Sequence, residues 1–109
     1  MADDKGARRI GRYVRMEALP GQGAALAEAL LRVAANVGDS PACELYLVNA
    51  SADEPDVVWI TEVWRDRAGA DAALGGELGE AGIGDVVPLL AAPPDLIEVA
   101  PLGGPGLPA

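Results

Sequence analysis

The sequence contains no histidine, no phenylalanine and only one cysteine. Without histidine, no Ser-His-Asp or Cys-His catalytic arrangement can form, and neither can a histidine-based zinc site or a haem held by a proximal histidine. Acid–base chemistry is left to carboxylates, tyrosine, lysine, the single thiol or the substrate itself. Cys43 has no partner for an intramolecular disulfide, and its small apolar side chain predicts a buried structural thiol.

Aromatic side chains are scarce as well. Half of the 109 residues are apolar, but most of these are small or aliphatic. A large flat ligand would therefore have to meet one of very few rings. The four aromatic residues are Tyr13, Tyr46, Trp59 and Trp64.

The net charge of −9 opposes nucleic-acid binding, which depends on cations placed on phosphates. No apolar stretch approaches the roughly 20 residues that span a bilayer, and the first residues lack the apolar region of a signal peptide. We therefore expect a soluble cytoplasmic protein that binds neither nucleic acid nor membrane. The cations near the N-terminus predict either a solvated end or an anion-binding surface; they are Lys5, Arg8, Arg9, Arg12 and Arg15.

Hydrophobic periodicity predicts four strands and two main helices. Helices are expected at 24–37 and 68–74, with one or two further helical turns within 86–91. The glycine-rich segment 75–84 favours a loose or broken connection, which would serve either as a pocket lid or only as a link. The strands are expected at 9–18, 42–49, 57–64 and 96–99, with a hairpin connection at 53–56.

The resulting order, strand, helix, strand, strand, helix, strand, is that of the ferredoxin-like split βαβ fold, an α+β architecture with an antiparallel sheet. The length fits one domain, which we place at 9–104 between a disordered N-terminal tail, 1–8, and a C-terminal tail, 105–109. The strand 57–64 is apolar at nearly every position, so we expect cover on both faces, from a helix and from a partner subunit.

Five short motifs stand in the order and spacing of a known family. They are Leu19-Pro20-Gly21, Pro41-Ala42-Cys43-Glu44-Leu45-Tyr46, Trp59-Ile60-Thr61-Glu62-Val63-Trp64-Arg65-Asp66, Pro93-Pro94 and Pro101-Leu102-Gly103-Gly104. In these motifs the chain resembles the antibiotic-biosynthesis monooxygenase family of dimeric α+β barrels, quinol monooxygenase-like proteins among them. The resemblance covers residues 9 to 104.

The resemblance implies a homodimer whose sheets meet back to back, with the C-terminal segment reaching the partner and a pocket between sheet and helices. Family members bind flat, hydrophobic and often polycyclic compounds. Some oxygenate phenolic or anthrone-like compounds to quinones with neither metal nor flavin, and others degrade haem or act on quinols. The resemblance thus implies a monooxygenase without cofactors that takes an aromatic substrate and O₂.

Trp64 matches the family's pocket tryptophan, where its ring would either stack on a ligand or fill the core. Glu62 lies on the same strand face and is either a catalytic base with a raised pKa or a structural carboxylate. Ile60 and Val58 share this face. Arg12 would either hold a phenolate or carboxylate of the substrate or reach outward at the sheet edge.

Val14 and Ile60 are expected to line the pocket, in positions where oxygenating relatives carry asparagines. Tyr46 and Asn49 are also candidate substrate-binding residues, but their opposite parity allows only one of them to face the pocket. Ala73 stands where relatives often have a histidine. These departures argue against haem degradation, and they leave two alternatives to oxygenation: a non-catalytic protein that binds a hydrophobic metabolite, or a polyketide cyclase or isomerase.

Overall fold

The computed structural model describes residues 8–75 and 83–107. It confirms the predicted order of strands and helices, and the ends of the four strands and two main helices lie within one residue of those expected. The elements are β1 (Ile10–Glu17), α2 (Gly23–Val37), β2 (Cys43–Ala50), β3 (Val57–Trp64), α3 (Arg67–Gly75), α5 (Ile83–Val86), the 3₁₀ turn η1 (Val87–Leu89) and β4 (Asp95–Val99).

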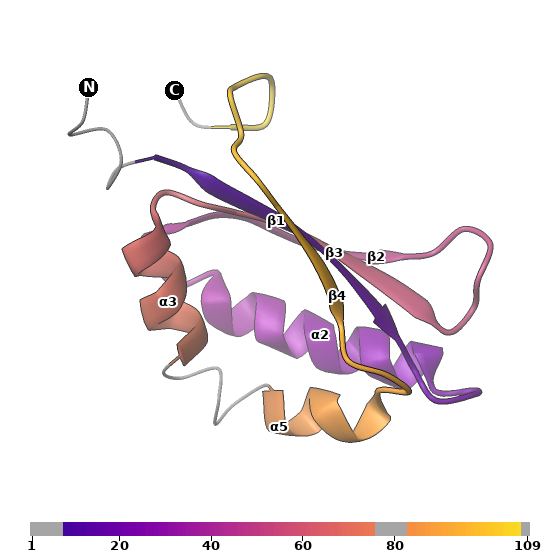
Figure 1. Cartoon of the computed structure of the whole chain (residues 1–109). Helices are drawn as coiled ribbons and strands as arrows, with labels where there is room; N and C mark the ends of the chain where they lie inside the picture. The colour runs from indigo at the N-terminus through magenta and orange to yellow at the C-terminus, as the bar shows by residue number, and fades with distance from the viewer. Residues whose placement is uncertain (1–7, 76–82, 108–109) are drawn as a thin grey trace.

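The four strands form one antiparallel sheet in the order β2-β3-β1-β4, which confirms the ferredoxin-like fold. The helices α2, α3 and α5 all lie on one side of this sheet (Figure 1). We call that side the helix face and the other side the open face. None of the described helices is long and apolar enough to cross a membrane.

The core lies between the helix face and α2. Alternate residues of β1 and β3 point into it, as the period of two predicted. The α2 positions spaced four, three and four residues apart pack against them. All four members of this helical stripe are buried: Leu26, Leu30, Val33 and Val37.

The start of α2 is tied to the β2–β3 connection. The carboxylate of Asp56 accepts hydrogen bonds from the backbone N–H groups of Gly21 and Gly23, both at 3.0 Å. Gly23 approaches the backbone of Pro55 so closely that a Cβ would overlap the Pro55 carbonyl oxygen. These contacts hold the start of α2 against the β2–β3 connection.

The open face carries no helix in the part of the chain that the structure describes. Val57 and Val63 are buried there, but several larger apolar side chains are exposed. Two-sided burial of β3 is therefore incomplete in a single copy of the chain. The exposed side chains are Tyr13, Leu47, Trp59, Ile97 and Val99.

Beyond β4, the chain leaves the sheet on the side away from the helices (Figure 1). Leu102 in this segment is almost wholly exposed. The predicted N-terminal tail, apart from Arg8, lies outside the described residues, and so does most of the glycine-rich segment considered as a lid.

Candidate functional site

Arg12 lies in the middle of the helix face with a carboxylate on each side. The antiparallel registers place it directly opposite Glu62 on β3 and Glu98 on β4. Its Nη1 is 3.6 Å from Glu62 Oε1, and its Nε is 3.6 Å from Glu98 Oε2. Each of the two strands that flank β1 thus places one carboxylate beside the Arg12 guanidinium.

The Arg12 side chain is only 11% exposed, yet its Nε–H group is buried without a hydrogen-bond partner. A separation of 3.6 Å is an ion pair and too long for a hydrogen bond. A buried donor without an acceptor lowers the stability of the folded protein, so the Nε–H group of Arg12 has an unmet need for a hydrogen-bond acceptor.

Glu62 accepts a 2.7 Å hydrogen bond from the indole Nε1 of Trp64, and both side chains are buried. Loss of solvent raises the pKa of Glu62, while the bond from Trp64 and the charge of Arg12 oppose this rise. Trp64 is packed in the core and does not line either cavity described below. A stacking role for its ring therefore stays a prediction.

The structure gathers most of the predicted site residues on the helix face. Val14 and Ile60 are buried opposite each other, and Tyr46 lies opposite Glu62. Burial, followed by the nearby Glu62 carboxylate, raises the pKa of the Tyr46 phenol. The group brought together is Arg12, Val14, Tyr46, Ile60, Glu62 and Trp64.

Asn49 is not part of this group. The parity of β2 places it on the open face, where its amide donates to the Trp59 carbonyl and the Thr61 hydroxyl at 3.2 and 3.3 Å. The predicted burial of Cys43 is only partial, because β2 is an edge strand of the sheet. The thiol still packs against the core, and burial raises its pKa.

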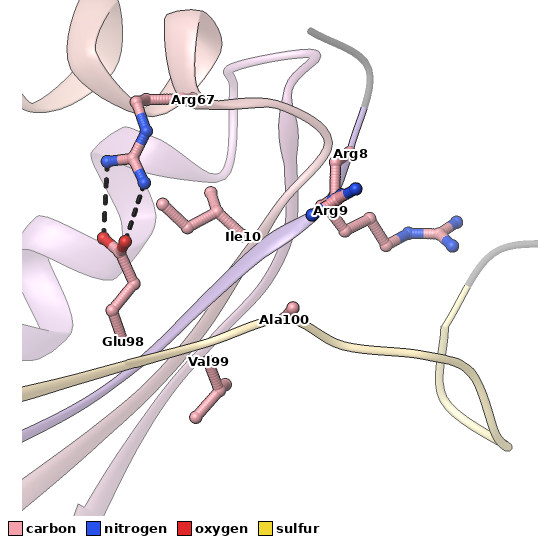
Figure 2. A pocket seen from close by; sticks show the side chains of 7 residues that line it. All are labelled: Arg8, Arg9, Ile10, Arg67, Glu98, Val99 and Ala100. Carbon is pink, nitrogen blue, oxygen red and sulfur yellow. Dashed lines mark hydrogen bonds and ion pairs between the residues drawn. The ribbon is translucent and has the colours of Figure 1, made fainter. Parts of the chain in front are cut away.

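A cavity of about 420 Å³ opens beside this group, between the start of β1, the end of β4 and the first turn of α3. Its volume lies in the range of small-molecule sites. Arg67 donates two hydrogen bonds across it to the two oxygens of Glu98, at 2.7 and 3.4 Å, and Ile10 lies beside this pair (Figure 2). The remaining lining residues are Arg8, Arg9, Val99 and Ala100.

Sequence reasoning missed Glu98 and Arg67. Glu98 interrupts the apolar run at 96–99, which was a usable signal, but its place beside Arg12 depends on the pairing of β1 with β4. Arg67 is the first residue of α3, where the positive end of the helix dipole disfavours a cation. This conflict was the signal that Arg67 serves something other than helix stability.

A second cavity, of about 440 Å³, lies on the open face between the sheet and the C-terminal segment. Its lining is largely apolar and includes Tyr13, Leu47, Val99 and Pro101. As for metals, the described residues contain no cluster of three or more cysteine, aspartate or glutamate side chains placed to hold an ion.

A four-stranded antiparallel sheet with helices on one face and a charged site between the two layers defines a ferredoxin-like α+β domain. Residues 9–81 match the family model of antibiotic biosynthesis monooxygenases. The chain therefore belongs to the antibiotic biosynthesis monooxygenase family, as the motifs predicted.

Solved structures agree with this assignment. A candidate antibiotic biosynthesis monooxygenase from Chloroflexus aurantiacus J-10-fl is 34% identical, with a TM-score of 0.81 over 92% of this chain and 99% of that one. A protein of unknown function from Nitrosomonas europaea is 28% identical, with a TM-score of 0.78 over 95% and 98%. A Caulobacter crescentus CB15 structure, 19% identical with a TM-score of 0.81 over 94% and 100%, shares the fold. Among curated proteins, none matches the sequence significantly.

Proposed function

We propose that the protein is a monooxygenase without cofactors, which oxidises an electron-rich phenolic, anthrone- or quinol-type aromatic compound to a quinone. The observation that carries the proposal is the cavity at the β1, β4 and α3 ends. It combines apolar side chains for an aromatic body, Ile10 and Val99, with the guanidinium of Arg67, which can stabilise a phenolate. Membership of the monooxygenase family points to O₂ as the second substrate.

The proposed reaction balances without an external reductant. In an anthrone, the methylene carbon between the rings loses a proton, and the resulting anion passes electrons to O₂. One oxygen atom becomes the new quinone carbonyl, and the other leaves as water with both methylene hydrogens. The substrate supplies all the electrons, so the protein needs only to orient it, stabilise its anion and exclude water.

The test is aerobic incubation with a panel of anthrones, naphthols and hydroquinones, followed by quinone absorbance. We expect quinone formation well above autoxidation, and we expect Arg67→Gln to slow it, since this variant removes a cation from the cavity. Arg32→Gln, on the exposed side of α2, is the matched control and should behave as the parent. No product above autoxidation across the panel would overturn the proposal.

One observation favours a second candidate, a non-catalytic protein that holds a hydrophobic metabolite. Glu62, the candidate base, already accepts a hydrogen bond from Trp64 and is faced by Arg12, as expected of a structural carboxylate. Binding of a panel compound that is recovered unchanged in the presence of O₂ would favour this candidate. Conversion of a compound that continues under nitrogen would instead favour the cyclase or isomerase.

We also propose that two copies pair through their open faces. Exposed apolar side chains on Tyr13, Leu47, Trp59 and Ile97 form a surface of the kind that marks protein contacts. In a twofold symmetric dimer, this surface of one copy would pack against the same surface of the other copy. The second cavity and the exposed Leu102 would then lie at the edge of the same contact.

Light scattering tests the pairing directly. The parent should have twice the 11.1 kDa mass of the chain, and Leu47→Glu should reduce it to a monomer. Leu31→Glu is a close control, because Leu31 is 56% exposed on α2 and Leu47 is 50% exposed on the open face. A parent that remains monomeric at high concentration would refute the pairing.

A further inference from the structure

The Arg67–Glu98 pair has the geometry with which a guanidinium recognises a carboxylate ligand. Two N–H groups face the two oxygens of one carboxylate, in the fork-shaped arrangement that gives arginine its specificity for this group. The pair lies in the lining of the 420 Å³ cavity and not on an isolated surface (Figure 2). The Glu98 carboxylate therefore occupies a place where a ligand's carboxylate would fit.

This pair is easily replaced. The side chains of Arg67 and Glu98 are 60% and 40% exposed, and exposed ion pairs contribute little to stability. Arg67 also contributes nothing favourable to the helix that carries it, because a cation at the first position opposes the helix dipole. The N-terminus of α3 is capped separately, by the Asp66 carboxylate on the N–H group of Gly69 at 2.7 Å.

Glu98 has a second partner within reach. The Nε–H of Arg12 is buried without an acceptor, and Glu98 Oε2 is 3.6 Å away. A movement of less than about 1 Å would bring these atoms to the 2.7–2.9 Å of a charged hydrogen bond. If Glu98 leaves Arg67, the unsatisfied donor on Arg12 gains an acceptor, which offsets the loss.

We propose that the cavity takes an aromatic compound bearing a carboxylate, which replaces Glu98 on Arg67 while Glu98 moves onto Arg12. This inference rests on the proposed function and narrows its substrate class. Glu98 is a positioning residue here: it keeps Arg67 oriented when the cavity is empty and completes the coordination of Arg12 when the ligand is bound. A neutral aromatic of the same shape lacks the group needed for this exchange.

Binding is measured by calorimetry on the full chain without O₂, with 1-hydroxy-2-naphthoate and its methyl ester as probes. We expect the acid to bind about tenfold more tightly than the ester, a difference typical of one charged hydrogen-bonded contact. Arg67→Gln should remove most of this preference. Glu98→Gln should tighten binding of the acid several-fold and leave the ester unchanged, because the competing charge is gone. Arg32→Gln should change neither.

The movement of Glu98 has its own readout in the ¹⁵N–¹H signal of Arg12 Nε. Addition of the acid should shift this signal in the parent protein and leave it in place in Glu98→Ala, where no carboxylate can move. Equal affinity for acid and ester, or an acid affinity that is no tighter in Glu98→Gln, would overturn the inference. Because no O₂ is present, such a result leaves the oxidation of neutral phenols intact. If the naphthoate binds but no panel compound gives a quinone, the proposed oxygenase function is wrong and the carboxylate site stands.

Discussion

Nε1 of Trp64 donates a 2.7 Å hydrogen bond to Oε1 of Glu62, two residues earlier on the same face of β3. The ring thereby uses its only donor inside the protein, and the carboxylate is held in the core beside Arg12. Glu62 thus connects the core residue Trp64 to Arg12. Arg12 in turn faces Glu98, which lines the cavity.

Trp64→Phe removes the donor and leaves a smaller ring. We expect it to lower the free energy of unfolding by roughly 1–3 kcal/mol through the poorly satisfied buried carboxylate, with a further loss from the cavity it creates. Urea denaturation measures this. The matched control is the same Trp64→Phe substitution made in Glu62→Gln, where no carboxylate is left poorly satisfied and the loss relative to Glu62→Gln should be smaller. Equal losses in the two backgrounds would contradict a structural role for the Trp64–Glu62 bond.

Glu62 should make stability depend on pH. Burial raises its pKa in the folded protein above the ordinary value of 4.5, so between these two pKa values the folded state binds more protons than the unfolded state. By linkage, stability then falls as pH rises through this window, and the full contribution of the protonated group is present only below it. In Glu62→Gln this fall should disappear. Parallel pH profiles for parent and variant would refute the raised pKa.

Arg12→Met should leave the buried carboxylate of Glu62 without its facing cation. Breaking a buried ion pair by removing one partner costs about 3–5 kcal/mol, so we expect a loss of this order near neutral pH. The loss should shrink in acid, where Glu62 is protonated. The double variant Arg12→Met/Glu62→Gln should recover part of the stability; thermal unfolding of all three proteins decides whether it does.

Gly23→Ala should destabilise the start of α2. The added Cβ would overlap the Pro55 carbonyl oxygen, and the neighbouring hydrogen bond to Asp56 would have to lengthen. Overpacking of this kind costs about 1–3 kcal/mol. Gly84→Ala is the control, because a Cβ on Gly84 meets nothing within 4 Å. A loss as small as that of Gly84→Ala would show that the hairpin does not fix the helix.

The fold could be predicted from the sequence because the local patterns that define its helices and strands are strong. The strands and α2 have strong periods of two and of 3.6, and breakers such as Pro20-Gly21 and Pro93-Pro94 separate them. Strand parity correctly placed Arg12, Val14, Glu62 and Trp64 on one face.

The site was only partly predictable, because it depends on which strands lie side by side. Arg12 and Glu98 are 86 positions apart in the sequence. They meet only because β4 pairs with the free edge of β1. Arg67 reaches Glu98 only because α3 begins beside that edge. The bond between Trp64 and Glu62 was missed because parity gives the shared face but not the side-chain rotamers that join them.

The most direct test of the proposed oxygenation is an incubation of the protein with an anthrone that it converts, under ¹⁸O₂ in unlabelled water, with the product analysed by mass spectrometry within the first turnovers. We predict that the new quinone carbonyl carries one ¹⁸O atom and that the second labelled atom appears in water. A quinone that carries only unlabelled oxygen, or one formed equally fast with Arg67→Gln and without protein, would contradict a monooxygenase acting through this cavity.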